Sequence, residues 1–411
     1  MRTFEENLAL YAKLAIRGGV NLQPGQELLL YADIADAVFA RLIAAEAYKS
    51  GAKNVHILYG DEQAVLIRYK DGNDEAMHYA PNWFYDGLTV AMKGNTSRLG
   101  ILSSDPNLLK NVAPEKIANY SKTQGLAMRS IMDIITQGQI NWSLVGAPSP
   151  AWAKQVFPGD EEKIAVQKLW DAIFSVSRVL EDDPIASWTN HCDSLEKRQE
   201  WMNQRRFTEV HFTGPGTDLK VGLAENSIWQ GGWGHSTKGI KHGPNVPTEE
   251  VFSMPHRLNV NGKVSSTKPL SVRGQVVDGI EVEFKDGAII KASAKKGEDT
   301  FLKLLDTDPG AKHLGEVALV PNSSKVSQSN VLFYNTLYDE NAASHIALGK
   351  SYAGNMPGYP TLTKQERLEK GSNDSLIHVD WMIGSSEINV SAKSASGPVK
   401  LMEAGEWVEK L

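Results

Sequence analysis

The sequence lacks several features that would place the protein outside the cytoplasm or in a membrane. It contains a single cysteine, Cys192, among 411 residues, so no intrachain disulfide is possible. Any metal site must therefore use His and carboxylate ligands. No run reaches the ~20 apolar residues of a membrane span. Glu5, Glu6 and Asn7 interrupt the apolar core that a signal peptide would need. We expect a cytoplasmic protein without a membrane partner.

A basic surplus is also missing. The 43 Lys and Arg residues are outnumbered by 49 Asp and Glu residues, which gives a net charge of −6. This balance argues against nucleic acid as a partner, because nucleic-acid binders normally carry a basic stripe. Neither of the glycine-rich phosphate-binding motifs, G-x-G-x-x-G after the first strand or G-x-x-x-x-G-K-[ST], occurs. Apolar residues make up 41% of the chain, which is sufficient for a sizeable core. The length suggests two or three domains.

The first half alternates strand and helix patterns. The apolar run Glu27–Tyr31 follows Pro24-Gly25 and predicts a buried strand, Asp33–Lys49 has helical spacing, and Asn54–Tyr59 predicts the next strand. This strand–helix–strand order predicts a parallel sheet. Similar patterns predict helices at Asp74–Met92 and Lys163–Leu180, and strands at Arg98–Leu102 and Trp142–Gly146. We therefore predict an α/β domain with a parallel sheet over residues 1–190.

The pattern changes after about residue 205. Short strand-like runs are separated by the hairpin-type dipeptides Asn261-Gly262, Asp278-Gly279 and Asp286-Gly287. The runs are Thr208–Thr213, Leu219–Leu223, Gly262–Val264, Ile280–Phe284 and Ala288–Lys291, and a helix is expected at Thr300–Asp306. Residues 191–411 are therefore predicted to form a strand-rich α+β domain, with the boundary between residues 185 and 205.

The strongest local signal for chemistry is His378-Val379-Asp380, in a strand that ends at Gly384. Residues two apart in a strand share a face, so His378 and Asp380 point the same way. An imidazole and a carboxylate on one face suit Zn, Co or Mn. By itself the same pattern is more typical of a solvated strand face.

Other candidate ligands are individually less specific. Glu316 opens an apolar strand, where a carboxylate is costly to bury unless it is paired or bound to a metal. Glu249 and Glu250 lie between Pro247 and an apolar pair, and His345 lies among small residues. Each could instead be an exposed acid or a packing residue. Tyr352 follows seven residues after His345, and a tyrosine hydroxyl there could donate to a developing oxyanion.

Taken together, these segments resemble a known family. The order NVPTEEVFSMPH (Asn245–His256), GEVALV (Gly315–Val320), NAASHIALG (Asn341–Gly349) with Tyr352, and HVDWMIG (His378–Gly384) is similar to the M29 metallo-aminopeptidases, of the thermophilic aminopeptidase T type. The resemblance extends over essentially the whole chain. Members often have Pro-His-Lys where this chain has Pro255-His256-Arg257, a difference that leaves the metal residues unaffected.

The resemblance implies a function and a set of site residues. It implies metal ligands at Glu250, Glu316, His345, His378 and Asp380, and a catalytic role for Tyr352. It also implies a cytoplasmic homodimer whose C-terminal domain holds two divalent metal ions, with Zn, Co or Mg as candidates. The expected reaction is the release of N-terminal residues from peptides by attack of a metal-activated water. The alternatives are another two-metal hydrolase acting on small amides or phosphoesters, and a protein in which the metal only stabilises the fold.

Charge balance favours two ions over one. Two divalent cations neutralise the three carboxylates of Glu250, Glu316 and Asp380 together with one hydroxide, and they leave open coordination positions for a substrate. Which carboxylate bridges the ions cannot be read from the sequence. Glu249 is the candidate general base, because strand alternation would hold it close to the ligand Glu250. The substrate's α-amino group would bind a metal or an acid such as Glu340.

Overall fold

The computed structural model describes residues 2–272, 275–395 and 397–411. The chain forms two compact units, each with its own core. Unit 1 comprises Met1–Asp193, Gly232–Thr248 and Val331–Phe333, and unit 2 comprises Ser194–Gly231, Glu249–Asn330 and Tyr334–Leu411. Helix α10 (Pro184–Arg205) contributes residues to both units. All of the predicted site residues belong to unit 2.

Unit 1 is built on a parallel sheet of four strands in the order β2-β1-β3-β4. The strands are β1 (Glu27–Asp33), β2 (Asn54–Gly60), β3 (Thr96–Leu102) and β4 (Trp142–Gly146). Each of the four predicted strands is present. The middle strand β1 is almost fully buried at Leu28, Leu29 and Leu30, as expected for a parallel strand covered on both faces.

The helices of unit 1 begin and end where local signals allow. Helix α1 (Phe4–Leu14) starts with a capping box in which the Thr3 and Glu6 side chains bind each other's backbone N–H groups. The others are α2 (Ala37–Lys49), α3 (Glu62–Asp71), α4 (Asp74–Met77), α5 (Asn82–Lys93), α6 (Pro114–Ala127), α7 (Arg129–Thr136), α8 (Pro150–Val156) and α9 (Glu162–Val176). The single helix predicted over Asp74–Met92 is wrong. Pro81 disfavours helical backbone at the residue before it and becomes the N-cap of α5, so the segment forms α4 and α5 instead.

Unit 2 contains two large antiparallel sheets. One has eight strands in the order β15-β14-β11-β6-β5-β19-β20-β21, and the other has five in the order β18-β17-β16-β10-β7. The first comprises β5 (Glu209–Gly214), β6 (Thr217–Leu223), β11 (Pro255–Ser265), β14 (Glu281–Lys285), β15 (Ala288–Ser293), β19 (Asn389–Ser394), β20 (Gly397–Glu403) and β21 (Glu406–Trp407). The second comprises β7 (Gln230–Gly231), β10 (Val251–Ser253), β16 (Leu314–Leu319), β17 (His345–Gly349) and β18 (His378–Met382).

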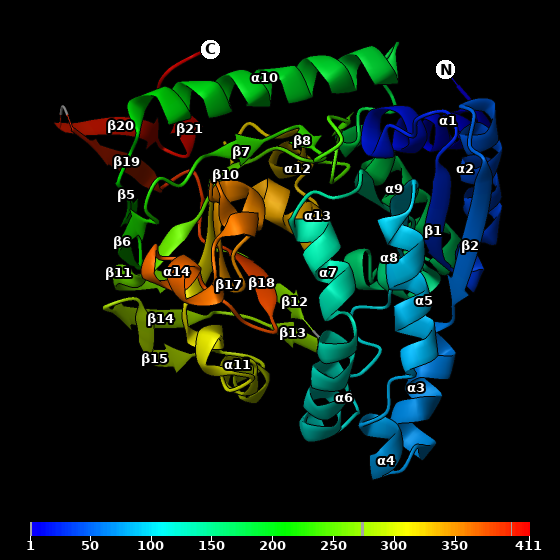
Figure 1. Ribbon diagram of the computed structural model, residues 1–411, viewed down its shortest axis with the longest axis horizontal. Coiled ribbons are helices and arrows are strands. Elements are labelled where there is room, and N and C mark those ends of the chain that lie inside the picture. Colours follow the sequence, from blue (N-terminus) through cyan, green and yellow to red (C-terminus); the bar gives the residue numbers. More distant parts are fainter. Residues whose placement is uncertain (1, 273–274, 396) are drawn as a thin grey trace. The chain divides into compact units, whose positions relative to one another are not determined.

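One hydrophobic core joins these two sheets, with members such as Phe212 and Val221 from the eight-stranded sheet and Trp381 from the five-stranded sheet. Helix α11 (Glu298–Leu305) lies beside the β14–β15 hairpin, and the short helices α12 (Lys325–Gln328), α13 (Thr336–Asp339) and α14 (Lys364–Glu369) lie in the connections (Figure 1). The predicted fold class is confirmed: a parallel α/β sheet in the first part of the chain and antiparallel strands in the second. Across the described ranges, no helix is both long and apolar enough to cross a membrane.

Candidate metal centre

The five predicted ligands lie on one face of the five-stranded sheet. Asp380 in β18 pairs with Ala347 in β17, which pairs with Glu316 in β16. His345 pairs with Ala318, two residues after Glu316, and His378 lies two residues before Asp380. Residues that pair across strands, or that lie two apart along one strand, share a face. Glu250 ends the irregular segment directly before β10, the strand that pairs with β16.

The composition of the two faces explains why the sheet can hold charged groups. Between the ligands the site face carries the small side chains of Ala318 and Ala347. The opposite face carries Val317, Ile346 and Trp381, which are fully buried in the core of unit 2. Burial of this apolar face anchors the strands, and the site face is left for polar chemistry.

The ligand atoms form two groups that share one carboxylate. His345 Nε2 lies 3.0 Å from Glu250 Oε2 and 3.5 Å from Glu316 Oε1. His378 Nε2 lies 3.7 Å from Glu316 Oε2 and 3.4 Å from Asp380 Oδ1. Glu316 thus presents one oxygen to each histidine. The groups Glu250–Glu316–His345 and Glu316–His378–Asp380 each have ligand atoms within 4.8 Å of one another, a spacing that suits one cation per group.

Backbone contacts fix the orientation of both imidazoles. His345 Nδ1 lies 3.2 Å from the carbonyl oxygen of Ala343, and His378 Nδ1 lies 2.7 Å from that of Lys350. A carbonyl accepts only, so Nδ1 carries the proton in each ring. The Nε2 atoms therefore face the carboxylates, and a hydrogen bond of this kind typically orients a histidine that binds metal.

The chemistry of the donor set fits divalent cations. Glu250, Glu316, His345 and Asp380 are each less than 10% exposed. Among the described residues, Glu250 Oε2, His345 Nε2 and Asp380 Oδ1 are buried without a partner in hydrogen-bonding geometry. Leaving such atoms unpaired is costly, and a bound cation would satisfy all three. Carboxylate and imidazole donors suit Zn and Co, and carboxylates also suit Mg.

The electrostatics show how strongly this cluster attracts positive charge. Burial, together with the nearby carboxylates of Glu250 and Asp380, raises the pKa of Glu316 to about 7, and the neighbouring imidazole of His345 opposes this rise. Burial opposes the charged form of His378, but Asp380 and Glu316 outweigh it and raise its pKa to about 9. Several carboxylates in one buried space cannot all stay ionised without a compensating charge. Protons supply that charge when cations are absent.

Tyr352 lies at the edge of this cluster. Its ring contacts that of His378 with centroids 4.6 Å apart, and it contacts Phe252 at 6.1 Å. Burial and then the charge of Glu316 raise the pKa of Tyr352 well above its usual value. The hydroxyl therefore stays protonated at neutral pH and can act as a hydrogen-bond donor.

Two buried asparagines hold the segment that carries Tyr352. Asn355 Nδ2 donates to the carbonyl oxygens of Ile228 at 3.1 Å and Phe252 at 3.3 Å. Asn373 N donates to Ser351 Oγ at 2.9 Å, and Ser351 N donates to the Asn373 carbonyl at 3.0 Å. These contacts fix the backbone on both sides of Tyr352. Sequence reasoning missed both asparagines, because nothing along the chain reveals partners so distant in sequence.

Two further acids differ from expectation. Glu250 and Glu249 precede β10 rather than lying in it, so the strand alternation expected to direct Glu249 does not apply. Glu249 is 5% exposed, and its backbone N–H donates to Asn341 Oδ1 at 2.6 Å. Glu340 belongs to the charge cluster itself, since burial and then the charges of Asp380 and Glu250 raise its pKa well above its usual value. The signal for Glu340 in the sequence was an acid directly before the small-residue segment around His345.

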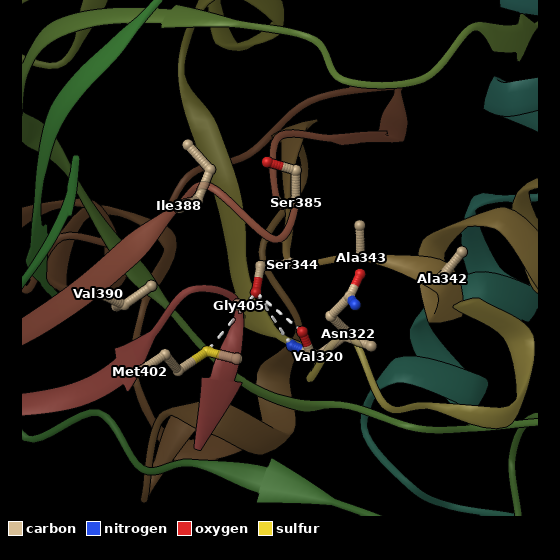
Figure 2. Close-up of a pocket in the computed structure, with 11 residues that line it drawn as sticks. Val320, Asn322, Ala342, Ala343, Ser344, Ser385, Ile388, Val390, Met402 and Gly405 are labelled. Atoms are coloured by element: carbon tan, nitrogen blue, oxygen red, sulfur yellow. Dashed lines mark hydrogen bonds between the residues drawn. The ribbon is translucent and has the colours of Figure 1, made fainter. Parts of the chain in front are cut away.

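A separate small pocket lies beside the segment that leads into β17 (Figure 2). Its lining is mostly small and apolar and includes Ala343, Val390 and Met402, but none of the predicted ligands. Ser344, the residue directly before His345, lines this pocket. Its hydroxyl accepts a hydrogen bond from Val320 N at 3.1 Å. The pocket therefore backs the ligand strand and is not the metal centre.

Comparisons with known proteins match the chain over nearly its full length. Residues 4–407 match a family described as thermophilic metalloprotease (M29). Aminopeptidase T of Thermus aquaticus is 44% identical, with 99% of this chain and 100% of that protein covered. Aminopeptidase 2 of Geobacillus stearothermophilus is 42% identical, with complete coverage of both chains.

The fold agrees with a solved structure as well. Wild-type AmpT from Thermus thermophilus superimposes with a TM-score of 0.92 at 42% identity. The match covers 99% of this chain and 100% of that chain. The whole architecture is therefore shared, and not one sheet or one motif alone.

Proposed function

This chain belongs to the M29 family of thermophilic metalloproteases, as its motifs predicted, and we propose that it releases N-terminal residues from peptides with two divalent cations in the centre described above. It is a metallo-aminopeptidase by family. The number of ions, the role of each residue and the assembly go beyond family membership and are proposed below.

The observation that carries the two-ion proposal is the shared position of Glu316. Its two carboxylate oxygens face different histidines, and each histidine has a second carboxylate, Glu250 or Asp380, beside it. Glu250 and His345 would hold one ion and His378 and Asp380 the other, with Glu316 between them. When bound, such cations polarise a scissile carbonyl and lower the pKa of a water molecule. Zn, Co and Mg all suit the donors.

Tyr352 supplies a donor that the ligands cannot. A hydroxyl that stays protonated can donate to the oxygen of the scissile carbonyl as negative charge develops there. Its ring contact with His378 keeps it beside the cluster, and Asn355 and Ser351 fix its backbone. We assign Tyr352 to stabilisation of the oxyanion.

Two acids are available for proton transfer and substrate binding. Glu249 remains the proposed general base, supported by its burial and its place beside the ligand Glu250. Glu340, in the same charge cluster, is a candidate acceptor for the substrate's α-amino group, with a metal as the alternative. An acceptor for that group would restrict the reaction to free N-termini.

Two further parts of the proposal rest on the family resemblance. These are a homodimeric assembly and a cytoplasmic location. Peptides are the proposed substrates, since the similar proteins from Thermus aquaticus and Geobacillus stearothermophilus are named aminopeptidases.

A direct assay tests this function against its alternatives. Release of leucine or arginine from p-nitroanilides is measured with Co²⁺, Zn²⁺ or Mg²⁺, with and without a chelator. We expect turnover that the chelator abolishes and added metal restores. Turnover of bis-p-nitrophenyl phosphate alone would instead support another two-metal hydrolase. A melting point that falls with chelator, without turnover of any substrate, would support a structural metal.

A further inference from the structure

An aromatic side chain occupies the site face of the sheet without a role in the chemistry described so far. Phe252 in β10 pairs with Ala318, which pairs with the ligand His345. Residues that pair across strands share a face, so Phe252 lies on the same face as the metal residues. On this face Met382 is almost fully buried at 2% exposure, whereas Phe252 is partly exposed.

The neighbours of Phe252 cover only part of its side chain, which remains partly exposed. Tyr352 contacts one side, with ring centroids 6.1 Å apart and planes at 65°. On the β7 side, Phe252 pairs with Gln230, whose amide lies so close to Gly354 that a Cβ atom there would meet Gln230 Oε1 at 2.7 Å. Towards the metal residues, Phe252 pairs with Ala318, whose side chain is a single methyl group.

The position of Phe252 suits the side chain of a substrate rather than its reacting carbonyl. Adjacent strands lie about 4.8 Å apart, so Phe252 is about 10 Å from His345 across the sheet, measured between backbones. If the metal residues hold cations that bind the scissile carbonyl, the first side chain of the peptide would have to cover this separation to contact the ring of Phe252.

The rest of the site face presents little apolar surface that an apolar side chain of a substrate could contact. Apart from the buried Met382, its other members near the cluster are carboxylates, imidazoles and the methyl groups of Ala318 and Ala347. A partly exposed phenyl ring would bury further apolar area if an aliphatic or aromatic side chain covered it. This gain is available to a leucine or phenylalanine residue and hardly to alanine.

We propose that Phe252 is a specificity-determining residue, which contacts the side chain of the substrate's N-terminal residue and favours large apolar ones. The inference rests on the proposed aminopeptidase function. It differs from a role as a support for Tyr352, because a support would affect all substrates alike.

The test compares the wild type with Phe252→Ala, Phe252→Leu and Leu258→Ala on the p-nitroanilides of leucine and alanine. Leu258 is 51% exposed on β11 of the same unit and serves as the matched apolar truncation. For Phe252→Ala we expect the leucine-to-alanine ratio of kcat/KM to fall about 10-fold or more. Phe252→Leu should restore most of that ratio, and Leu258→Ala should leave it unchanged.

Additional readouts separate specificity from structural damage. Metal content, melting temperature and the shape of the pH profile should match the wild type in Phe252→Ala. An equal fall for both substrates, or a shifted pH profile, would overturn the inference and leave Phe252 as a support for Tyr352. An unchanged ratio would also overturn it. Absence of wild-type turnover with any metal would instead refute the proposed function, and this inference with it.

Discussion

At the residue scale, the centre combines groups that touch each other and yet are proposed to act differently. The rings of Tyr352 and His378 are 4.6 Å apart. His378 presents Nε2 to Glu316 and Asp380 and is a proposed ligand, whereas Tyr352 carries a protonated hydroxyl and is a proposed donor. Single substitutions at these two residues should therefore give different phenotypes.

Removing the Tyr352 hydroxyl should damage turnover but not metal binding. Tyr352→Phe keeps the ring, so the contacts with Phe252 and His378 survive. Loss of one oxyanion donor typically costs ~10²–10³ in turnover, and kcat and kcat/KM should fall together with little change in KM. Steady-state kinetics and elemental analysis measure both quantities. Retention of more than half the wild-type turnover would leave Tyr352 as a packing residue.

Removing the His378 imidazole should act through the metal. His378→Ala deletes a ligand from the Glu316–His378–Asp380 group, so that group should lose its ion and activity should fall. Excess metal should restore part of the activity, which it should not do for Tyr352→Phe. Activity is titrated against added Co²⁺ or Zn²⁺ for both variants. Equal responses of the two variants to metal would contradict the separate roles.

One part of the site could be predicted from the sequence, and another part could not. The His378–Asp380 pair lies two apart in one strand, so its common face follows from strand geometry alone. The position of Glu316 between the two histidines, on which its proposed bridging role rests, depends on the pairing of β16 with β17, including an irregularity between Leu314 and Glu316. Pairing between strands thirty residues apart is not encoded locally, so the bridging carboxylate could not be chosen in advance. The position of Glu340 in the charge cluster likewise depends on contacts between residues that are distant in the sequence.

At the scale of elements, strands were easier to predict than helix boundaries. All four strands of the parallel sheet appear, because a buried parallel strand is a continuous apolar run flanked by turns. The long helix α10 crosses the expected domain boundary, and its residues gave no turn signal. The short strands β7 and β10 were not predicted, since two or three residues carry no period.

One buried acid after β1 gives an element-scale prediction for stability. Asp36 is 7% exposed, and burial raises its pKa to about 6, although Ser103 donates a hydrogen bond to it at 2.6 Å. The folded state therefore holds this proton more tightly than the unfolded state. The resulting stability is fully present below about pH 4 and is lost as the pH rises through 6.

Replacing Asp36 with Asn should remove this loss of stability at high pH. A shift of about two pKa units corresponds to about 3 kcal/mol at most. We therefore expect Asp36→Asn to raise the free energy of unfolding by about 1–3 kcal/mol at pH 7.5, and to change it little at pH 4. Urea unfolding at the two pH values measures this difference. The assignment would be contradicted if Asp36→Asn changed the free energy of unfolding at pH 7.5 no more favourably than at pH 4.

At the scale of the whole molecule, the proposal includes a homodimer. The chain mass is 45.1 kDa, so the assembly should have a mass of ~90 kDa, twice that of the chain. An obligate interface buries more than about 2,000 Å² and keeps the dimer intact at micromolar concentration. Light scattering on the purified protein gives the mass. A stable 45.1 kDa species would contradict this part of the proposal.

The central claim is that one bridging carboxylate, Glu316, organises two cations in each chain. The most direct test removes all metal, adds back Co²⁺ or Zn²⁺ in known equivalents, and measures bound metal by elemental analysis together with peptide hydrolysis. The two groups that share Glu316 predict saturation at two ions per chain, with full activity only when both are present. Full activity at one bound ion per chain would contradict the account.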